Sequence, residues 1–307
     1  MASLDVPAGR FVDLDGPVHY VEWEGPPERT FVLVHGLGGS HLNWIRVAPA
    51  LARHGRVVVP DLPGFGRSPL GGRRSAMHVG RRLLGDFLRK VGTGQVILGG
   101  NSMGGGYAML QAAFEPDSIA GLILTASVFP WARAGVPSPL VVGGFAMYRT
   151  PWVGERVVAA RFRHLDPEKV VRWGFRITAS DPSSIPSEVI GAHVDLVRER
   201  QRDPSAAPAF LEAARSILWL GARPSLTTRV IDAIDAPVLV IHGSRDRLVP
   251  LAYAMSVLER RPTWDNAILP GLGHVPQLEA PDRWLRAVER WLVERGLAEP
   301  ERGREPS

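Results

Sequence analysis

Residues 100–104 read Gly-Asn-Ser-Met-Gly and follow the apolar run Gln-Val-Ile-Leu at residues 95–98, with only Gly99 between them. A serine presented at a sharp strand-to-helix turn has a strained backbone, so the positions two residues before and after it must be nearly free of side chain. Gly100 and Gly104 meet this requirement, and apolar residues recur at near-helical spacing from Met103 to Phe114. The pattern predicts a buried strand, a tight turn and a helix, with Ser102 at the turn.

A serine hydroxyl is a weak nucleophile that needs a base, and the base needs an orienting acid. Of the nine histidines, His274 stands in the loop Gly-Leu-Gly-His-Val-Pro, after a short apolar run at residues 267–269. Asp246 follows a second strand-like run at residues 237–241. Catalytic groups in open parallel sheets gather beyond the carboxyl ends of the strands. We therefore expect Ser102, Asp246 and His274 to converge, in the chain order Ser, Asp, His.

The order of elements predicts an α/β fold. Strand-like runs near residues 11–15, 18–23 and 30–35 come first, and helix and strand then alternate up to residues 122–125. Alternation favours a mostly parallel sheet with helices on both faces. Residues 128–235 are different, because they are rich in proline and tryptophan, and we interpret them as an inserted helical cap over the carboxyl edge of the sheet. The expected core is discontinuous, with residues 1–127 and 236–300, and residues 301–307 form a flexible tail.

Further motifs add a family resemblance. Residues 31–39 (Phe-Val-Leu-Val-His-Gly-Leu-Gly-Gly), the pair Asn43-Trp44 and residues 61–68 (Asp-Leu-Pro-Gly-Phe-Gly-Arg-Ser) accompany the Ser102 turn. Together they resemble the α/β-hydrolase superfamily, and within it the capped serine-esterase-like branch, over about residues 10–127 and 236–295. The resemblance implies an eight-stranded, mostly parallel sheet. It also implies a carboxylesterase-like or lipase-like serine hydrolase that cleaves an ester with an apolar moiety through an acyl-enzyme on Ser102.

Two backbone N–H groups are expected to form the oxyanion hole. Met103 N–H directly follows the nucleophile at a helix amino terminus, where free N–H groups and the helix dipole favour an anion. The resemblance puts the second donor, Leu37 N–H, just after the His-Gly pair. His35 itself, His242 and Asp61 are interpreted as loop-bracing residues. The stretch at residues 125–129 contains no carboxylate, so Asp246 is the expected acid.

The expected substrate pocket combines small and apolar residues from the core and the cap. Its candidate lining residues are Gly36, Trp131, Phe145, Met147, Trp152, Trp173 and Val249.

Composition narrows the function classes. The net charge is +5, but the arginines are spread along the chain and no nucleic-acid motif accompanies them, so no nucleic-acid partner is expected. The glycine runs do not match dinucleotide or P-loop spacing, there is no cysteine, and no metal or organic cofactor is expected. No apolar run is long enough to be transmembrane, and the first ten residues lack a signal-peptide pattern, which favours a cytoplasmic protein. No pattern indicates an oligomeric state.

Several alternatives share the same triad. By resemblance, carbon-carbon bond hydrolases, cofactor-free perhydrolases, amidases and acyltransferases remain open. Halide-releasing and epoxide-opening relatives use a carboxylate at the turn, which Ser102 does not provide. A hydrolase-fold receptor that binds a small molecule without turnover is an alternative of another class, because a fold does not fix a function.

Overall fold

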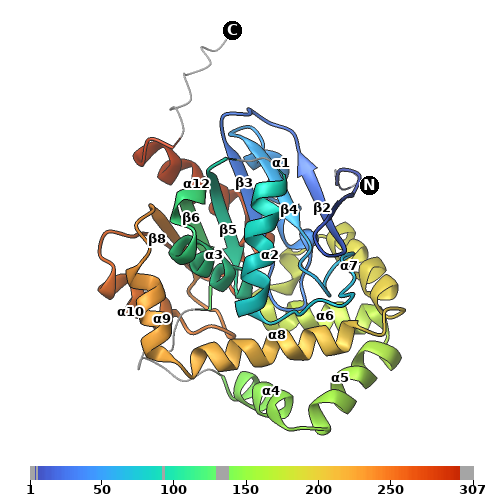
Figure 1. The fold of residues 1–307 in the computed structure, drawn as a ribbon. Helices are drawn as coiled ribbons and strands as arrows, with labels where there is room; N and C mark the ends of the chain where they lie inside the picture. Colours follow the sequence, from blue (N-terminus) through green and yellow to red (C-terminus); the bar gives the residue numbers. More distant parts are fainter. Residues whose placement is uncertain (1–3, 5, 92–93, 129–137, 298–307) are drawn as a thin grey trace.

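The computed structural model describes residues 4, 6–91, 94–128 and 138–297. One sheet organises this part of the chain (Figure 1). Its eight strands are β1 (Arg10–Asp13), β2 (Pro17–Trp23), β3 (Thr30–Val34), β4 (Arg56–Pro60), β5 (Val96–Asn101), β6 (Ile119–Thr125), β7 (Val238–Gly243) and β8 (Asp265–Leu269). They lie in the order β1-β2-β4-β3-β5-β6-β7-β8. The β1/β2 and β2/β4 pairs are antiparallel and the other pairs are parallel, so the expected fold class is confirmed.

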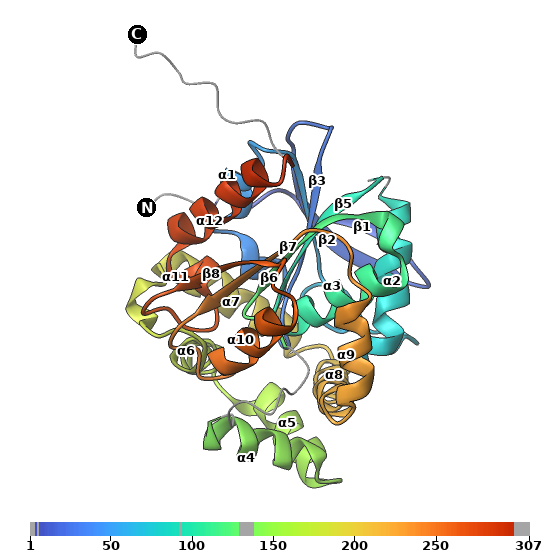
Figure 2. The ribbon, with the colours of Figure 1, turned by 90° about the vertical axis from the view of Figure 1, so that its left-hand side faces the viewer.

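Helices cover both faces of the sheet (Figure 2). Val32 and Val34 of β3 face one side, in a buried cluster with residues of α2 (Met77–Lys90), α3 (Met103–Phe114) and α10 (Leu251–Arg260). Phe31 and Leu33 face the other side, with η1 (His41–Trp44), α1 (Ala48–Leu51), α11 (Pro276–Glu279) and α12 (Pro281–Glu294). A short 3-10 turn, η2 (Pro116–Ser118), precedes β6. Alternation along a central strand therefore divides the core into two layers.

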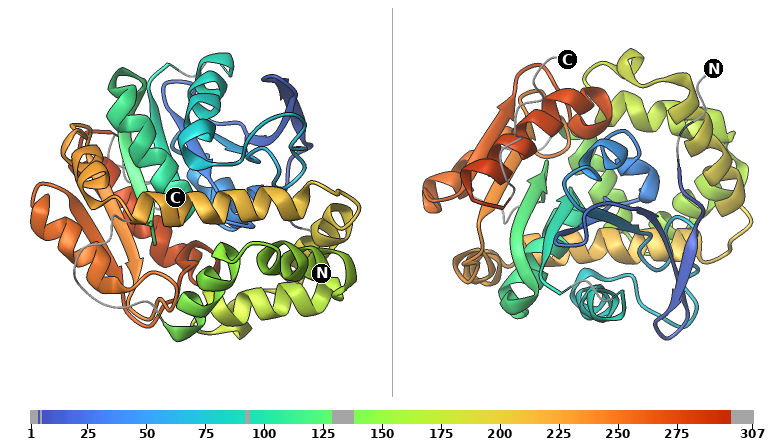
Figure 3. Two further views of the ribbon diagram at one scale, coloured as in Figure 1. Left: turned by 60° about the horizontal axis from the view of Figure 1, so that its bottom comes forward. Right: turned by 90° about the horizontal axis from the view of Figure 1, so that it is seen from above.

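The described residues between β6 and β7 form helices joined by loops, with no strand among them. They are α4 (Pro139–Arg149), α5 (Val153–His164), α6 (Pro167–Thr178), η3 (Pro182–Ser184), α7 (Ser187–Arg200), α8 (Ala206–Gly221) and α9 (Pro224–Asp232). We call this set the helical insert. Figure 3 shows α8 between the sheet and the outer helices α4 and α5. The end of the insert is docked on the core, because α8 contacts α2 and α9 contacts α3.

The insert contacts loops that follow the carboxyl ends of three strands. Phe210 of α8 lies against Gly38, after β3, and the adjacent Ala209 lies against Gly64, after β4. The backbone N–H of His274, after β8, donates to the oxygen of Thr178 at the end of α6, over 2.6 Å. The insert therefore lies at the sheet edge where parallel strands present their loops. Among the described helices, none combines the length and apolarity needed to cross a membrane.

Candidate active site

Ser102 occupies the turn between β5 and α3. Its backbone has φ 55° and ψ −117°, outside the regions that side chains usually permit. A Cβ on Gly100 would collide with the backbone of Gly104, and a Cβ on Gly104 would collide with the backbone oxygen of Val34. The two glycines therefore allow the close approach that the strained turn requires, as the sequence pattern predicts.

His274 and Asp246 form a hydrogen-bonded pair. Nδ1–H of His274 donates to Oδ2 of Asp246 over 2.7 Å, and the side chains are 5% and 0% exposed, respectively. The other oxygen of Asp246 accepts the N–H groups of Leu248 and Val249 at 2.8 and 3.0 Å. Burial alone would raise the pKa of Asp246, but the charge and hydrogen bond of His274 outweigh burial and hold this pKa below its usual value. The acid is thus ionised at neutral pH, and in the neutral form of the imidazole its hydrogen bond keeps the proton on Nδ1, so that Nε2 is the acceptor nitrogen.

Asn101 ties the histidine loop to the serine turn. This residue precedes Ser102, and its Nδ2 donates to the backbone oxygen of His274 and to that of Thr125, both at 3.1 Å. The side chain is 1% exposed, so both bonds are made away from water. The ends of β5 and β6 and the loop after β8 therefore meet around one amide, a contact that the sequence analysis missed.

Glu279, at the end of α11, holds the same loop from the other side. Its Oε1 accepts Gly273 N–H at 2.6 Å, and its Oε2 accepts the N–H groups of Ser180 and Asp181 at 2.6 and 3.0 Å. Glu279 is 6% exposed. One buried carboxylate thus joins the histidine loop to the segment between α6 and η3. The only sequence signal for Glu279 was a charged residue on a helix close to His274.

His35 fixes the peptide that carries the Leu37 N–H. Leu62 N–H donates to Nε2 of His35 at 3.0 Å, so Nδ1 carries the proton and donates to the oxygen of Gly36 over 2.7 Å. The Gly36 oxygen and the Leu37 N–H belong to one planar trans peptide and point in opposite directions. A Cβ on Gly36 would lie 3.2 Å from Cβ of Ser102, which places this peptide beside the serine.

Both histidines that end strands are neutral braces. Burial lowers the pKa of His35, which is fully enclosed. Burial also lowers the pKa of His242, whose Nε2–H donates to the oxygen of Val249 over 3.0 Å. His242 Nε2 lies 3.5 Å from the Asp246 carboxylate, farther than His274 Nδ1 does. The loop-bracing interpretation of these two residues therefore fits the geometry.

A cavity of about 100 Å³ lies between the loop after β3 and the insert. We call it the inner cavity. Most of its lining residues are apolar, and Arg161, His193 and Arg200 are the ionisable ones. The lining residues are Gly38, Gly39, Ser40, Phe65, Gly66, Arg161, Phe162, Val170, His193, Leu196, Val197, Arg200, Gln201, Ala206 and Phe210.

Of the expected pocket residues that the structure describes, none is in this lining. Trp152 is the residue before α5 and is 77% exposed. Trp173 on α6 is 48% exposed, and the guanidinium of Arg161 lies over its ring, 5.3 Å from the ring centre. Phe175, two residues later, is the aromatic residue of α6 that is buried. The sequence indicated an aromatic helix but not which of its faces turns inward.

The other pocket candidates have varied positions. Gly36 lies against Ser102, and Val249 is buried beside Asp246. Phe145 packs edge-on against Tyr148, at 6.0 Å between ring centres, and Met147 is half-buried on the same helix, α4. Trp131 and the tail at residues 301–307 lie outside the described residues.

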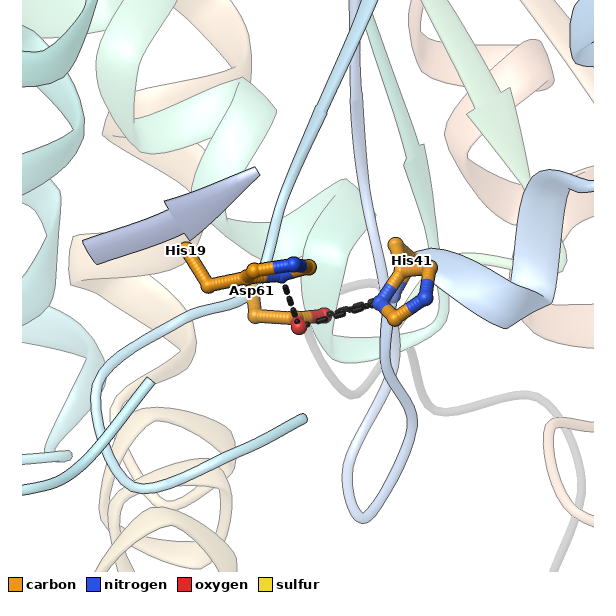
Figure 4. A group of neighbouring side chains, drawn as sticks. All are labelled: His19, His41 and Asp61. Atoms are coloured by element: carbon orange, nitrogen blue, oxygen red, sulfur yellow. Dashed lines mark hydrogen bonds and ion pairs between the residues drawn. The ribbon is translucent and has the colours of Figure 1, made fainter. Parts of the chain in front are cut away.

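One cluster among the described residues has the side chains of a metal site, and Figure 4 shows its geometry. His19 Nδ1–H donates to Asp61 at 2.8 Å, and His41 Nδ1–H does so at 3.0 Å. The carboxylate also accepts the backbone N–H groups of His41 and Arg67 at 2.6 and 2.9 Å. Burial would raise the pKa of Asp61, but these histidines hold it far below its usual range. Four donors satisfy this carboxylate without a cation, so the cluster is a brace between β2, η1 and the loop after β4.

Comparisons with known proteins agree with this architecture. The family model described as the alpha/beta hydrolase fold matches residues 29–281. A 2-hydroxy-6-oxononadienedioate/2-hydroxy-6-oxononatrienedioate hydrolase of Dechloromonas aromatica is 27% identical over 287 residues, 92% of each chain.

Two solved structures share the fold. The meta-cleavage product hydrolase of Pseudomonas fluorescens gives a TM-score of 0.73 at 20% identity, over 95% of this chain and 99% of that one. A thermophilic esterase of Thermogutta terrifontis gives a TM-score of 0.67 at 23% identity, over 94% of this chain and 99% of the esterase chain. The matched family model spans most of the chain, and the chain therefore belongs to the α/β-hydrolase fold family and is a hydrolase.

Proposed function

We propose that this hydrolase cleaves carboxylic esters with an apolar moiety through an acyl-enzyme on Ser102. The hydrogen bond of 2.7 Å between His274 and Asp246, on a loop tied to the serine turn by Asn101, carries this proposal. The ionised Asp246 keeps the proton of His274 on Nδ1, which leaves Nε2 as the base. The apolar character of the inner cavity supports an apolar group in the substrate.

The reaction has two steps that use side chains and water. In the first, Ser102 Oγ attacks the ester carbonyl, Nε2 of His274 takes the hydroxyl proton and then gives it to the departing alkoxide. In the second, His274 takes a proton from water, the resulting hydroxide attacks the acyl-enzyme, and the proton returns to Ser102 as the carboxylic acid leaves. The N–H groups of Leu37 and Met103 hold the negative oxygen in both steps. The helical insert acts as a cap that surrounds the substrate.

A second candidate reaction is carbon-carbon bond hydrolysis. The relative from Dechloromonas aromatica favours it, since its name specifies a hydrolase of 6-oxo dienedioates. Hydrolysis at a ketone breaks a carbon-carbon bond, and the same donors would stabilise the oxyanion. The two reactions differ in the leaving group, which is an alkoxide in one and a carbanion in the other.

A panel of purified substrates tests the proposal. Wild type and Ser102→Ala would be compared on p-nitrophenyl esters and on a 2-hydroxy-6-oxo-dienoate, with Ser118→Ala as the matched control. Ser118 is a partly buried hydroxyl whose bond is to Glu115, away from this site. We expect wild type and Ser118→Ala to hydrolyse the esters and Ser102→Ala to be inactive. A fluorophosphonate should label wild type on Ser102. Turnover of the dienoate without ester turnover would favour the second reaction. Equal activity of wild type and Ser102→Ala would remove Ser102 from the mechanism.

A further inference from the structure

A groove on the outer side of the insert is larger than the inner cavity. It has a volume of about 680 Å³ and lies between α5, α8 and residues 70–78, which comprise a loop and the first residues of α2. We call it the outer groove. Ligand sites usually occupy about 300–1,000 Å³, so the inner cavity of about 100 Å³ is too small for a sizeable ligand, whereas the outer groove is large enough.

The outer groove follows α8. Ala207, Leu211, Arg215 and Trp219 line it at intervals of four residues, which places them on one stripe of the helix. The twelve steps along the helix from Ala207 to Trp219 correspond to ~18 Å at 1.5 Å per residue. Ala159 on α5 contributes the facing wall. The groove therefore extends along α8, as the binding of an extended alkyl chain requires.

Four of the charged groups on its walls pair with one another. Arg215 forms an ion pair with Glu155 at 2.7 Å, and Arg74 forms one with Glu212. Glu212 also accepts the N–H and hydroxyl of Ser75, at 2.8 and 3.0 Å. Charges that satisfy each other offer no strong site for a charged ligand. Between them lie apolar surfaces, so the groove suits a neutral apolar chain.

Phe162 and Gln201 separate the groove from the inner cavity, since both residues line both spaces. Nε2 of Gln201 donates to the backbone oxygen of Leu165, at the end of α5, over 2.7 Å. The ring of Phe162 lies 6.2 Å from that of Phe210, on the inner side of α8. A half-buried phenylalanine and one amide hydrogen bond therefore form the partition.

We propose that the outer groove binds the long alkyl arm of the substrate, which passes the Phe162–Gln201 partition to reach the inner cavity and the loop after β3. This proposal rests on the proposed ester hydrolysis and specifies its substrate class, a neutral ester with a long alkyl chain. Phe162 sets the length of chain that the site accepts. Each buried methylene improves binding about fourfold, so filling the groove should change chain-length preference strongly.

Three variants on α5 test the proposal. Ala159→Trp fills the groove, Phe162→Ala opens the partition, and Val157→Trp is the matched control, because Val157 is 43% exposed and lies outside both linings. The readout is kcat/KM for p-nitrophenyl decanoate divided by that for the acetate, with thermal melting to verify folding. We expect the ratio to fall at least tenfold in Ala159→Trp, to rise severalfold in Phe162→Ala and to stay within twofold of wild type in Val157→Trp.

Binding without catalysis separates this proposal from the proposed function. The neutral fluorescent probe dansyl decylamide would be titrated into Ser102→Ala, alone and combined with Ala159→Trp. We expect the groove-filling change to weaken probe binding at least tenfold. Unchanged probe affinity together with an unchanged decanoate-to-acetate ratio of kcat/KM would overturn the proposed role of the outer groove, and would leave the role of Ser102 in catalysis intact. Weakened probe binding in a protein that cleaves no ester would instead refute the proposed function. If Ala159→Trp does not fold, an unchanged ratio in Phe162→Ala overturns the proposal.

Discussion

Replacing His35 should separate the positioning of the oxyanion hole from the chemistry of the triad. His35→Leu removes both the donor to the Gly36 oxygen at 2.7 Å and the acceptor of the Leu62 N–H at 3.0 Å. His35→Gln keeps one donor and one acceptor on a single side chain. The pair of variants therefore differs in the hydrogen bonds that the side chain can make at a fully buried position.

The size of the effect follows from the peptide that His35 holds. Loss of an entire oxyanion donor costs about 3 kcal/mol, or roughly a hundredfold in kcat, which is the upper limit for a Leu37 N–H that turns away. The Met103 N–H is unaffected, because it depends on the start of α3. We expect kcat of His35→Leu to fall about tenfold to a hundredfold with KM within about threefold. His35→Gln should recover most of this loss.

The assay needs a readout that simple destabilisation would not change. Two buried groups left unpaired cost about 1–3 kcal/mol each, so Tm will also fall. Measurements at a temperature where both variants are folded would compare kcat, KM and the affinity for a trifluoromethyl ketone, which mimics the tetrahedral intermediate. We expect ketone affinity to fall in parallel with kcat. Unchanged kcat in folded His35→Leu, or a loss confined to KM, would refute the reasoning.

The remaining predictions concern the acid, the brace and pH. Asp246→Asn should lower kcat about 10³-fold to 10⁴-fold with little change in KM, because the amide favours the wrong tautomer of His274; a loss below tenfold in steady-state assays would argue against this role. Asp61→Asn should lower Tm at pH 7. The pKa of Asp61 is lower in the folded than in the unfolded protein, so its carboxylate stabilises the fold at pH values above the unfolded pKa. The difference in Tm between variant and wild type should therefore shrink as pH falls below about 4. A constant difference in thermal melting from pH 7 to pH 3 would contradict this. Burial lowers the pKa of His193 to about 4. As pH falls, His193 is therefore protonated in the unfolded chain before it is protonated in the folded protein, and the free energy of unfolding should decline from about pH 6.5 towards pH 4. His193→Gln should flatten this decline in urea unfolding, and an unchanged slope would exclude His193 as its source.

The Ser102 turn shows what local sequence can predict. Two glycines at fixed spacing and an apolar run before them indicate a strained turn between a buried strand and a helix. The same holds for the strands before Asp246 and His274, whose apolar runs indicate burial and whose order indicates a parallel sheet. The backbone conformation of a tight turn depends mainly on neighbours within a few residues, and an apolar run marks a segment that can be buried, so a sequence pattern contains both signals directly.

Contacts between distant residues were decided by the tertiary structure. Asn101 bonds to the loop 173 residues later, and Glu279 joins that loop to the helical insert. Trp173 faces outward while Phe175 is buried, because the docking of α6 and not its composition determines the inward face. The order of residues along the chain specifies which residue types follow which strands. The packing of the insert on the sheet decided which of them meet, since side-chain partners are selected by shape and distance that no local pattern specifies.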